Sequence, residues 1–157
     1  MKVGIGYDMH QLVANRDFVI GGIKIDYHLG ILGHSDGDVL THAIINALLG
    51  AMGLGDIGQY FPSSDPKLKN ISSLILLDQI NDLLNENAYK IINIDTIIIC
   101  QKPKLSPYYN LIRENLANVL KIDSQLINLK STTTDNMGQI GANLAIASQA
   151  IALISKI

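Results

Sequence analysis

The sequence predicts an α/β (α+β) fold in which a single-layer mixed β-sheet has helices packed on one face. β-like segments and segments with the 3.6-residue apolar period of half-buried helices follow in the order β, ββ, α, α, β, α, β, α. The chain has 157 residues, 48% of them apolar, which is enough for one hydrophobic core. The other face of the sheet then needs a cover, and further copies of the chain are the simplest one.

Three strands are expected near the N-terminus. An apolar, β-like run over Lys2–Tyr7 predicts the first of them. Two further runs, Phe18–Ile20 and Ile23–Ile25, flank the pair Gly21-Gly22, and this combination is typical of a β-hairpin. The chain is therefore expected to begin with one strand and a separate hairpin.

Two helices are expected to follow the hairpin. Ser35 is the predicted N-cap of the first, with Asp38 three residues later in a capping-box arrangement. Apolar residues then recur with the helical period until Gly53, a residue type that favours helix termination. The serine pair at 72–73 can cap a second helix that reaches about Asn87.

The C-terminal half predicts strand, helix, strand and helix. Ile91–Gln101 is β-rich, and Ile97–Ile99 within it suggests a central strand buried on both faces. Tyr108–Leu120 is predicted to be a helix, and Ile127–Thr132 a short strand. The nearly all-apolar segment Leu144–Ile154 is expected to form a last helix, buried inside the fold or at a subunit contact.

Composition and charge exclude several classes of protein. The single cysteine, Cys100, rules out an internal disulfide and fits a reducing cytosol. The net charge is −2 and no basic run is present, so nothing indicates nucleic-acid binding. No apolar run is long enough to cross a bilayer, and the N-terminus does not resemble a signal peptide. We therefore expect a cytoplasmic protein without a membrane or nucleic-acid partner.

Asp8, His10 and His42 form the most informative motif. Side chains two positions apart on a strand point the same way, so Asp8 and His10 can share one target. His42 follows Asp38 by one helical turn, and Asp38 could accept its second ring N–H from outside the ligand set. Two imidazoles and one carboxylate leave the fourth position of a zinc ion free, as in catalytic zinc sites. Taken singly, the three residues could instead cap a turn, lie on the surface and fill the core.

Two further segments carry groups that suit a phosphorylated ligand. Ser131–Asp135 follows a predicted strand and offers hydroxyl and N–H groups to phosphate oxygens, while Asp135 could hold a hard cation such as Mg²⁺. Cys100–Pro107 leaves another strand with two lysines, at the sheet end where α/β proteins bind ligands, so it could line a nucleotide pocket. A ligand-free Thr-rich turn and an ordinary strand-to-helix connection are the alternatives.

Taken together, several motifs spread along the whole chain resemble those of a known family. They are Asp8-Met9-His10, His34-Ser35-Asp36-Gly37-Asp38, His42, Leu54-Gly55-Asp56-Ile57-Gly58, Phe61-Pro62, Asp65-Pro66, Gln101-Lys102-Pro103-Lys104 and Thr132-Thr133-Thr134. This combination is similar to that of the 2-C-methyl-D-erythritol 2,4-cyclodiphosphate synthases of the non-mevalonate isoprenoid pathway. Each motif is weak alone, and the combination is specific.

The resemblance implies one cyclodiphosphate synthase domain over residues 1–157, in a homotrimer with active sites between subunits. It implies a zinc ion held by Asp8, His10 and His42. It also implies a second divalent cation, Mg²⁺ or Mn²⁺, bound with the diphosphate of the substrate. Asp135 is the candidate ligand for this second cation.

The resemblance also implies roles for the remaining site residues. His34 and Thr133 match the positions that stabilise the transition state. The residues that would contact the methylerythritol phosphate are Ser35, Asp56, Ile57, Gly58, Phe61, Pro62, Ser63, Ser64 and Asp65. Those that would hold the cytidine and its diphosphate are Cys100, Gln101, Lys102, Pro103, Lys104, Leu105, Ser106, Thr132 and Thr134.

The implied activity is that of a phosphorus–oxygen lyase that releases CMP while closing a cyclic diphosphate. Three departures from the family pattern concern phosphate binding: Asp135 replaces the usual glutamate, Ser63 replaces an aspartate, and Gln139–Asn143 lacks the usual arginine. A zinc hydrolase with a metal-activated water is one alternative. A non-catalytic trimeric nucleotide-binding module, suggested by the missing arginine, is another.

Overall fold

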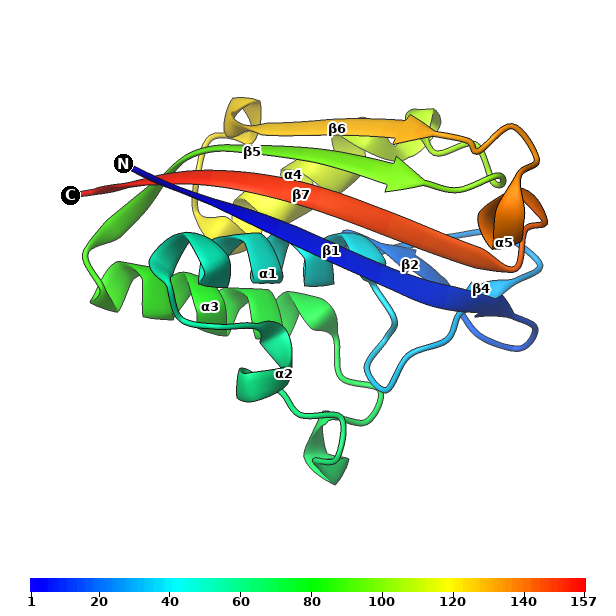
Figure 1. Ribbon diagram of the computed structural model, residues 1–157, viewed down its shortest axis with the longest axis horizontal. Helices are drawn as coiled ribbons and strands as arrows, with labels where there is room; N and C mark the ends of the chain where they lie inside the picture. The colour runs from blue at the N-terminus through cyan, green and yellow to red at the C-terminus, as the bar shows by residue number, and fades with distance from the viewer.

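A five-stranded mixed sheet runs through the computed structural model, which describes residues 1–157 (Figure 1). Its strands, in spatial order, are β4 (Gly30–Ile31), β1 (Lys2–Val13), β7 (Ala145–Lys156), β5 (Tyr89–Ile99) and β6 (Ile127–Thr132). All neighbours are antiparallel except β5 and β6, which are parallel. A separate hairpin consists of β2 (Phe18–Ile20) and β3 (Ile23–Ile25). The predicted mixed sheet and hairpin are confirmed.

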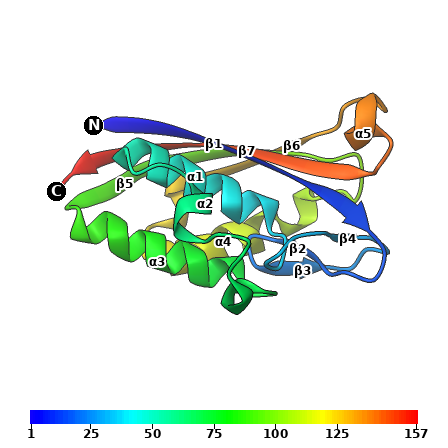
Figure 2. The same ribbon diagram turned by 60° about the horizontal axis from the view of Figure 1, so that its bottom comes forward.

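Helices α1, α3 and α4 lie on one side of this sheet, as Figure 2 shows. The α-helices are α1 (Val39–Met52), α2 (Ile57–Tyr60), α3 (Ser73–Glu86), α4 (Tyr109–Leu120) and α5 (Gly138–Gly141). Short 3₁₀ turns cover Pro66–Leu68, Ser106–Tyr108 and Ser124–Leu126. None of the helices combines the length and the apolar character needed to span a membrane.

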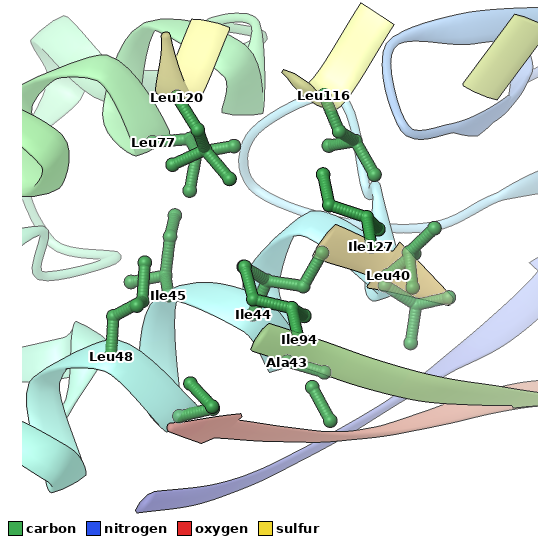
Figure 3. Packing of buried hydrophobic residues seen from close by; sticks show 14 of the residues in the cluster. Leu40, Ala43, Ile44, Ile45, Leu48, Leu77, Ile94, Leu116, Leu120 and Ile127 are labelled. Carbon is green, nitrogen blue, oxygen red and sulfur yellow. The ribbon is translucent and has the colours of Figure 1, made fainter. Parts of the chain in front are cut away.

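Helix α1 is the centre of the core because it is covered on both sides. Its backbone touches β1 directly: a Cβ added to Gly4 would lie 2.0 Å from the carbonyl oxygen of Ala47, and one added to Gly6 would lie 1.9 Å from that of Ala43. On its other side α1 packs against α3, and Figure 3 shows side chains of the helices and the sheet meeting in one cluster. The two glycines therefore bring α1 close against the strand that carries Asp8 and His10.

The opposite face of the sheet is apolar and uncovered in the single chain. Alternate residues of β1 point towards it, and Val3, Ile5 and Tyr7 are 66%, 63% and 56% exposed. Met9, also on β1, and Ile151, on the neighbouring strand β7, add further exposed apolar surface. An apolar patch of this kind on a sheet face is typical of a protein-protein contact.

The predicted last helix, Leu144–Ile154, is wrong, because this segment forms strand β7. β7 lies between β1 and β5, and its even-numbered residues from Ile146 to Ile154 face the helices. The odd-numbered residues Gln149, Ile151 and Leu153 face the open side. Its residues are apolar on both faces, so the two-residue period of a strand is absent from the sequence. A continuous apolar run of this kind does not distinguish a central strand from a buried helix.

Two smaller predictions are also corrected. β5 is an interior strand, as expected, because β7 and β6 flank it, but it is not buried on both faces. Of the Ile97–Ile99 run only Ile98 is fully buried, because the adjacent residues point to the open face. Ser35 is not the N-cap of α1. Asp38 is, and its carboxylate accepts a hydrogen bond from the backbone N–H of Thr41 at 3.1 Å. The remaining predicted strands and helices are present within a few residues of their expected ends.

Candidate metal centre

Strand β1 and the first turns of α1 bring the three predicted metal ligands together. β1 continues as far as Val13, so Asp8 and His10 share the strand face that carries Gly6 and contacts α1. His42 is the fourth residue of α1 and is only 8% exposed. One potential ligand atom from each of the three residues lies within 4.8 Å of the other two.

The donor atoms converge on one point. Oδ2 of Asp8 lies 2.8 Å from Nε2 of His10 and 2.9 Å from Nδ1 of His42. The two ring nitrogens are 3.3 Å apart. A carboxylate and two imidazoles at such distances are the donor set that proteins offer to zinc and other divalent transition metals.

The outer nitrogen of each imidazole shows why this set fits a cation. Nδ1 of His10 lies 2.6 Å from the carbonyl oxygen of Leu32, which can only accept, so the proton of the neutral ring belongs on Nδ1. Nε2 of His42 lies 2.9 Å from the hydroxyl of Ser73, which itself donates to a carboxylate of Asp36. The lone pairs of neutral His10 and His42 therefore both face the Asp8 carboxylate. A bound cation would accept these lone pairs and offset the repulsion between them and the carboxylate.

The charge on Asp8 is favoured by the same neighbours. Burial favours the neutral acid, but hydrogen bonds with His10 and His42 outweigh it and hold the pKa of Asp8 well below its usual range. For His10, burial opposes the charged ring, but the hydrogen bond and the charge of Asp8 outweigh it and raise the pKa of His10. Without a metal, the site therefore favours a proton on His10 and keeps the Asp8 carboxylate ionised.

The carboxylate of Asp38 does not bond the His42 ring, and this corrects the prediction that it would accept the second ring N–H. Its carboxylate instead accepts from the backbone N–H of Gly22 at 2.7 Å and from the hydroxyl of Thr41 at 2.8 Å. The one-turn rule holds inside a helix, whereas Asp38 is the N-cap and lies outside the helical conformation, with φ −65° and ψ 87°. Asp38, whose pKa is raised by burial, therefore fastens the β2–β3 hairpin to α1.

Ser73 and Asp36 take the place that had been assigned to Asp38. Besides its hydroxyl contact with Asp36, Ser73 donates its backbone N–H to the same carboxylate at 2.9 Å. Ser35 adds a second hydroxyl 3.1 Å from Nε2 of His42. Ser73 is 31 positions from His42, and in the sequence its only signal is that of a helix cap. Sequence reasoning therefore missed its contact with the metal ligand.

A cavity of about 260 Å³ opens beside the three ligands. Its lining residues are Asp8, His10, His34, Ser35, His42, Ile57, Gly58, Phe61, Ser63, Leu68 and Leu76. Six of the predicted site residues outside the metal set are thus brought to this cavity, namely His34, Ser35, Ile57, Gly58, Phe61 and Ser63. Asp56, Pro62, Ser64 and Asp65 belong to the same segment but do not line it. The carbonyl oxygen of Asp65 accepts from Nε2 of His34 at 2.9 Å.

A second hollow, of about 370 Å³, lies where the parallel strands β5 and β6 end. Its lining residues are Cys100, Gln101, Lys102, Pro103, Lys104, Leu105, Ser106, Ser131, Thr132 and Thr133. The two segments predicted to hold a nucleotide therefore lie together, joined by a hydrogen bond from the N–H of Cys100 to the carbonyl oxygen of Thr132 at 3.0 Å. Thr134 and Asp135 lie just outside it and are half-buried and exposed, respectively. No residue lines both hollows of the single chain.

Comparison with known proteins identifies the family. The YgbB family model matches residues 1–155. The chain belongs to the YgbB family. Two curated relatives are both named 2-C-methyl-D-erythritol 2,4-cyclodiphosphate synthase. The Clostridium perfringens protein is 53% identical over 156 residues, which cover 99% of this chain and 100% of the relative. The Clostridium acetobutylicum protein is 56% identical over 154 residues, which cover 98% and 99%.

Solved structures of this family share the fold. The bifunctional IspDF from Campylobacter jejuni superposes with a TM-score of 0.96 at 38% identity, covering 99% of this chain and 42% of that longer one. IspF from Plasmodium falciparum, solved as a complex with CDP, gives 0.87 at 35% identity and covers 99% and 96%. The resemblance to the cyclodiphosphate synthases is confirmed, and the chain is an enzyme of this family. The comparisons favour neither a hydrolase nor a non-catalytic module.

Proposed function

We propose that the protein converts 4-diphosphocytidyl-2-C-methyl-D-erythritol 2-phosphate into 2-C-methyl-D-erythritol 2,4-cyclodiphosphate and CMP, as a phosphorus–oxygen lyase. The observation that carries the proposal is the convergence of Asp8, His10 and His42 beside a cavity, in a chain that matches synthases of this name over its whole length. The match also supports residues 1–155 acting as one catalytic domain. The lone cysteine supports a cytoplasmic location.

The reaction needs no nucleophile from the protein. An oxygen of the 2-phosphate forms a bond to the β-phosphorus, the bond from that phosphorus to the CMP oxygen breaks, and CMP leaves with the electron pair. Because both groups belong to one substrate, holding them in line can supply about 7–11 kcal/mol of the barrier at best. Cys100 is not suited to attack in any case, since burial raises its pKa to about 11.

We propose zinc on Asp8, His10 and His42, and Mg²⁺ or Mn²⁺ near Asp135. When bound, these cations would supply Lewis-acid stabilisation of the charge that gathers on the phosphates. The chain itself would orient the substrate through Ser35 and residues 56–65. His34 and Thr133 would stabilise the charge on phosphate oxygens in the transition state.

We place the cytidine in the hollow between residues 100–106 and 131–133. The backbone groups and hydroxyls of this hollow suit a nucleotide, and the P. falciparum neighbour was solved as a CDP complex. In the single chain this hollow is separate from the cavity beside His42. A homotrimer, in which the nucleotide hollow of one subunit would face the metal site of another, joins the two. The exposed apolar residues Val3, Ile5 and Tyr7 support such an assembly.

The proposed function is tested by incubating protein that has been supplied with both zinc and magnesium with the cytidine-linked substrate. We expect CMP release together with a cyclic diphosphate in the phosphorus NMR spectrum. An open-chain phosphate would indicate a hydrolase instead, and CMP binding without turnover would indicate a non-catalytic module. His42→Ala should lose most of the zinc and the turnover while keeping the fold. His28→Ala, which changes an exposed histidine outside the site, is the control.

A further inference from the structure

Arg16 makes three hydrogen bonds that join parts of the chain otherwise far apart in sequence. It lies in the turn after β1, and its Nη2 donates to the carbonyl oxygen of Gly33 at 3.1 Å and to that of Ser35 at 3.0 Å. Its Nη1 donates to Oδ1 of Asn70 at 3.0 Å. A planar guanidinium can serve three acceptors at once, whereas the ammonium of lysine carries a point charge on a flexible stem.

The three acceptors surround His34. Gly33 and Ser35 are its two chain neighbours, and the backbone N–H of Asn70 donates to the carbonyl oxygen of His34 at 2.8 Å. Nothing in regular secondary structure holds this stretch, because β4 ends at Ile31 and α1 begins only at Val39. The position of His34 therefore depends on side-chain and loop contacts, and Arg16 bonds the backbone on both sides of it.

Ser35 connects Arg16 to the candidate metal ligand His42. The carbonyl oxygen of Ser35 is held by Arg16, while its hydroxyl lies 3.1 Å from Nε2 of His42. On the other side, Nε2 of His34 lies 2.9 Å from the carbonyl oxygen of Asp65, in the segment that borders the cavity. A shift of the 33–35 backbone would therefore move two groups in the site at the same time.

The base of the Arg16 side chain is itself fixed. The backbone carbonyl oxygen of Arg16 lies so close to Gly30 that a Cβ added to Gly30 would be 1.9 Å from it. The backbone carbonyl oxygen of the next residue, Asp17, accepts from the N–H of Ile31 at 2.9 Å. Both contacts anchor the turn to β4 at the edge of the sheet. Arg16 is thus a rigid link between the sheet and a loop that carries site residues.

We propose that Arg16 is a positioning residue, which holds the His34–Ser35 backbone in the place that the reaction needs. This inference rests on the proposed function, and it adds a residue that lines neither the metal cavity nor the nucleotide hollow. Arg16 borders a separate depression of about 320 Å³, together with Asn15, Asp17 and Asn70. The guanidinium can therefore be reached from solvent, away from the substrate.

The kinetic test compares Arg16→Gln and Arg16→Lys with Arg113→Gln, which changes the only other arginine of the chain. Displacing a catalytic group slightly can cost about 100-fold in rate, so we expect kcat to fall by about 10- to 100-fold in both Arg16 variants. We expect KM and bound zinc to stay near the wild-type values, and Arg113→Gln to behave as wild type. Unchanged kcat in Arg16→Gln, or an equal loss in Arg113→Gln, overturns the proposal.

Chemical rescue separates positioning from a general loss of stability. Low millimolar guanidinium should restore part of the kcat of Arg16→Ala, because the ion can enter the depression and bond the same carbonyl oxygens. It should not affect Arg113→Ala. If Arg16→Ala is poorly folded, the same comparison is made with Arg16→Gln, whose shorter and uncharged side chain leaves room for the ion. Absence of any rescue in a folded, zinc-loaded variant counts against the role of the guanidinium.

Hydrogen exchange tests the inference without the substrate. In Arg16→Gln, the amides of Asp36 and Asn70, which donate to Ile71 and His34, should exchange faster than in wild type. The amides within α1 should keep their protection. Equal exchange at both loop amides overturns the proposal. If the wild-type protein fails to release CMP, the proposed function fails, and this exchange result still decides whether Arg16 holds the loop.

Discussion

The hydroxyl oxygen of Ser73 lies 2.9 Å from Nε2 of His42, the ring nitrogen that does not face Asp8. Ser73 donates its own proton to Asp36, so its oxygen is left to accept from the imidazole. This pair sets the proton of His42 on Nε2 and leaves the lone pair of Nδ1 for a metal. The first residue of α3 thus selects the tautomer of His42, a candidate metal ligand on α1.

Ser73→Ala should weaken zinc binding by about 10- to 100-fold, the range typical when a hydrogen-bond partner of a ligating histidine is removed. The measurement is a competition titration with a chromophoric chelator. Ser72→Ala is a matched control, because Ser72 is the adjacent residue and its side chain makes no cap hydrogen bond. Equal zinc affinity in the two variants would show that Ser35 alone suffices to orient His42.

Zinc affinity should fall as the pH is lowered, with the fall already beginning above pH 6.5. In the metal-free protein the pKa of His10 is raised, so its proton is retained to higher pH and must leave before zinc binds. The same shift stabilises the metal-free fold below about pH 6.5, and this contribution is lost as the pH rises through the folded-state pKa. Chelator competition from about pH 6 to 8.5 checks the first effect, and affinity independent of pH would contradict it.

Ile5→Asp should convert a trimer into monomers. Ile5 is 63% exposed on the open sheet face, and in an apolar interface a carboxylate would be buried without a partner at a cost of several kcal/mol. Leu111→Asp is the matched control, since Leu111 is 53% exposed on α4, away from that face. Sedimentation velocity gives the subunit count. A monomeric wild type, or an Ile5→Asp protein that remains trimeric, would reject this interface.

Asp135→Glu should preserve or raise turnover if residue 135 binds the second cation, because glutamate keeps the carboxylate and extends its reach by one methylene. Asp135→Ala should raise the Mg²⁺ concentration needed for half-maximal activity. Asp135 is exposed, and its carboxylate accepts only from the hydroxyl of Thr133 at 3.3 Å, so the fold should be unaffected. Activity is measured as CMP release at increasing Mg²⁺. The exposed Asp26 provides a control, Asp26→Ala, and an unchanged Mg²⁺ dependence in Asp135→Ala would remove the proposed role.

Local sequence patterns predicted the structure correctly where it depends on residues a few positions apart in a regular element. Asp8 and His10 were predicted to point the same way because they lie two apart on a strand, and their side chains are 2.8 Å apart. The prediction that Asp38 would contact the His42 ring used a similar rule, the spacing of one helical turn. It was wrong because Asp38 is the N-cap and does not have helical backbone geometry. The β7 segment was misassigned because a strand that is apolar on both faces has no period to detect.

By itself the sequence determined the family, the candidate metal ligands and the two segments that line the hollow in which we propose that the cytidine binds. Each of these depends on which chemical groups are present and on spacings of a few residues. Only the tertiary structure decided that Ser73 orients His42, that Arg16 holds the Ser35 carbonyl, and that the apolar C-terminal run is a strand. These contacts join residues from 19 to 31 positions apart in the first two cases. They form because the packing of α1 against β1 and α3 brings separate segments within hydrogen-bond distance, and no local pattern encodes that approach.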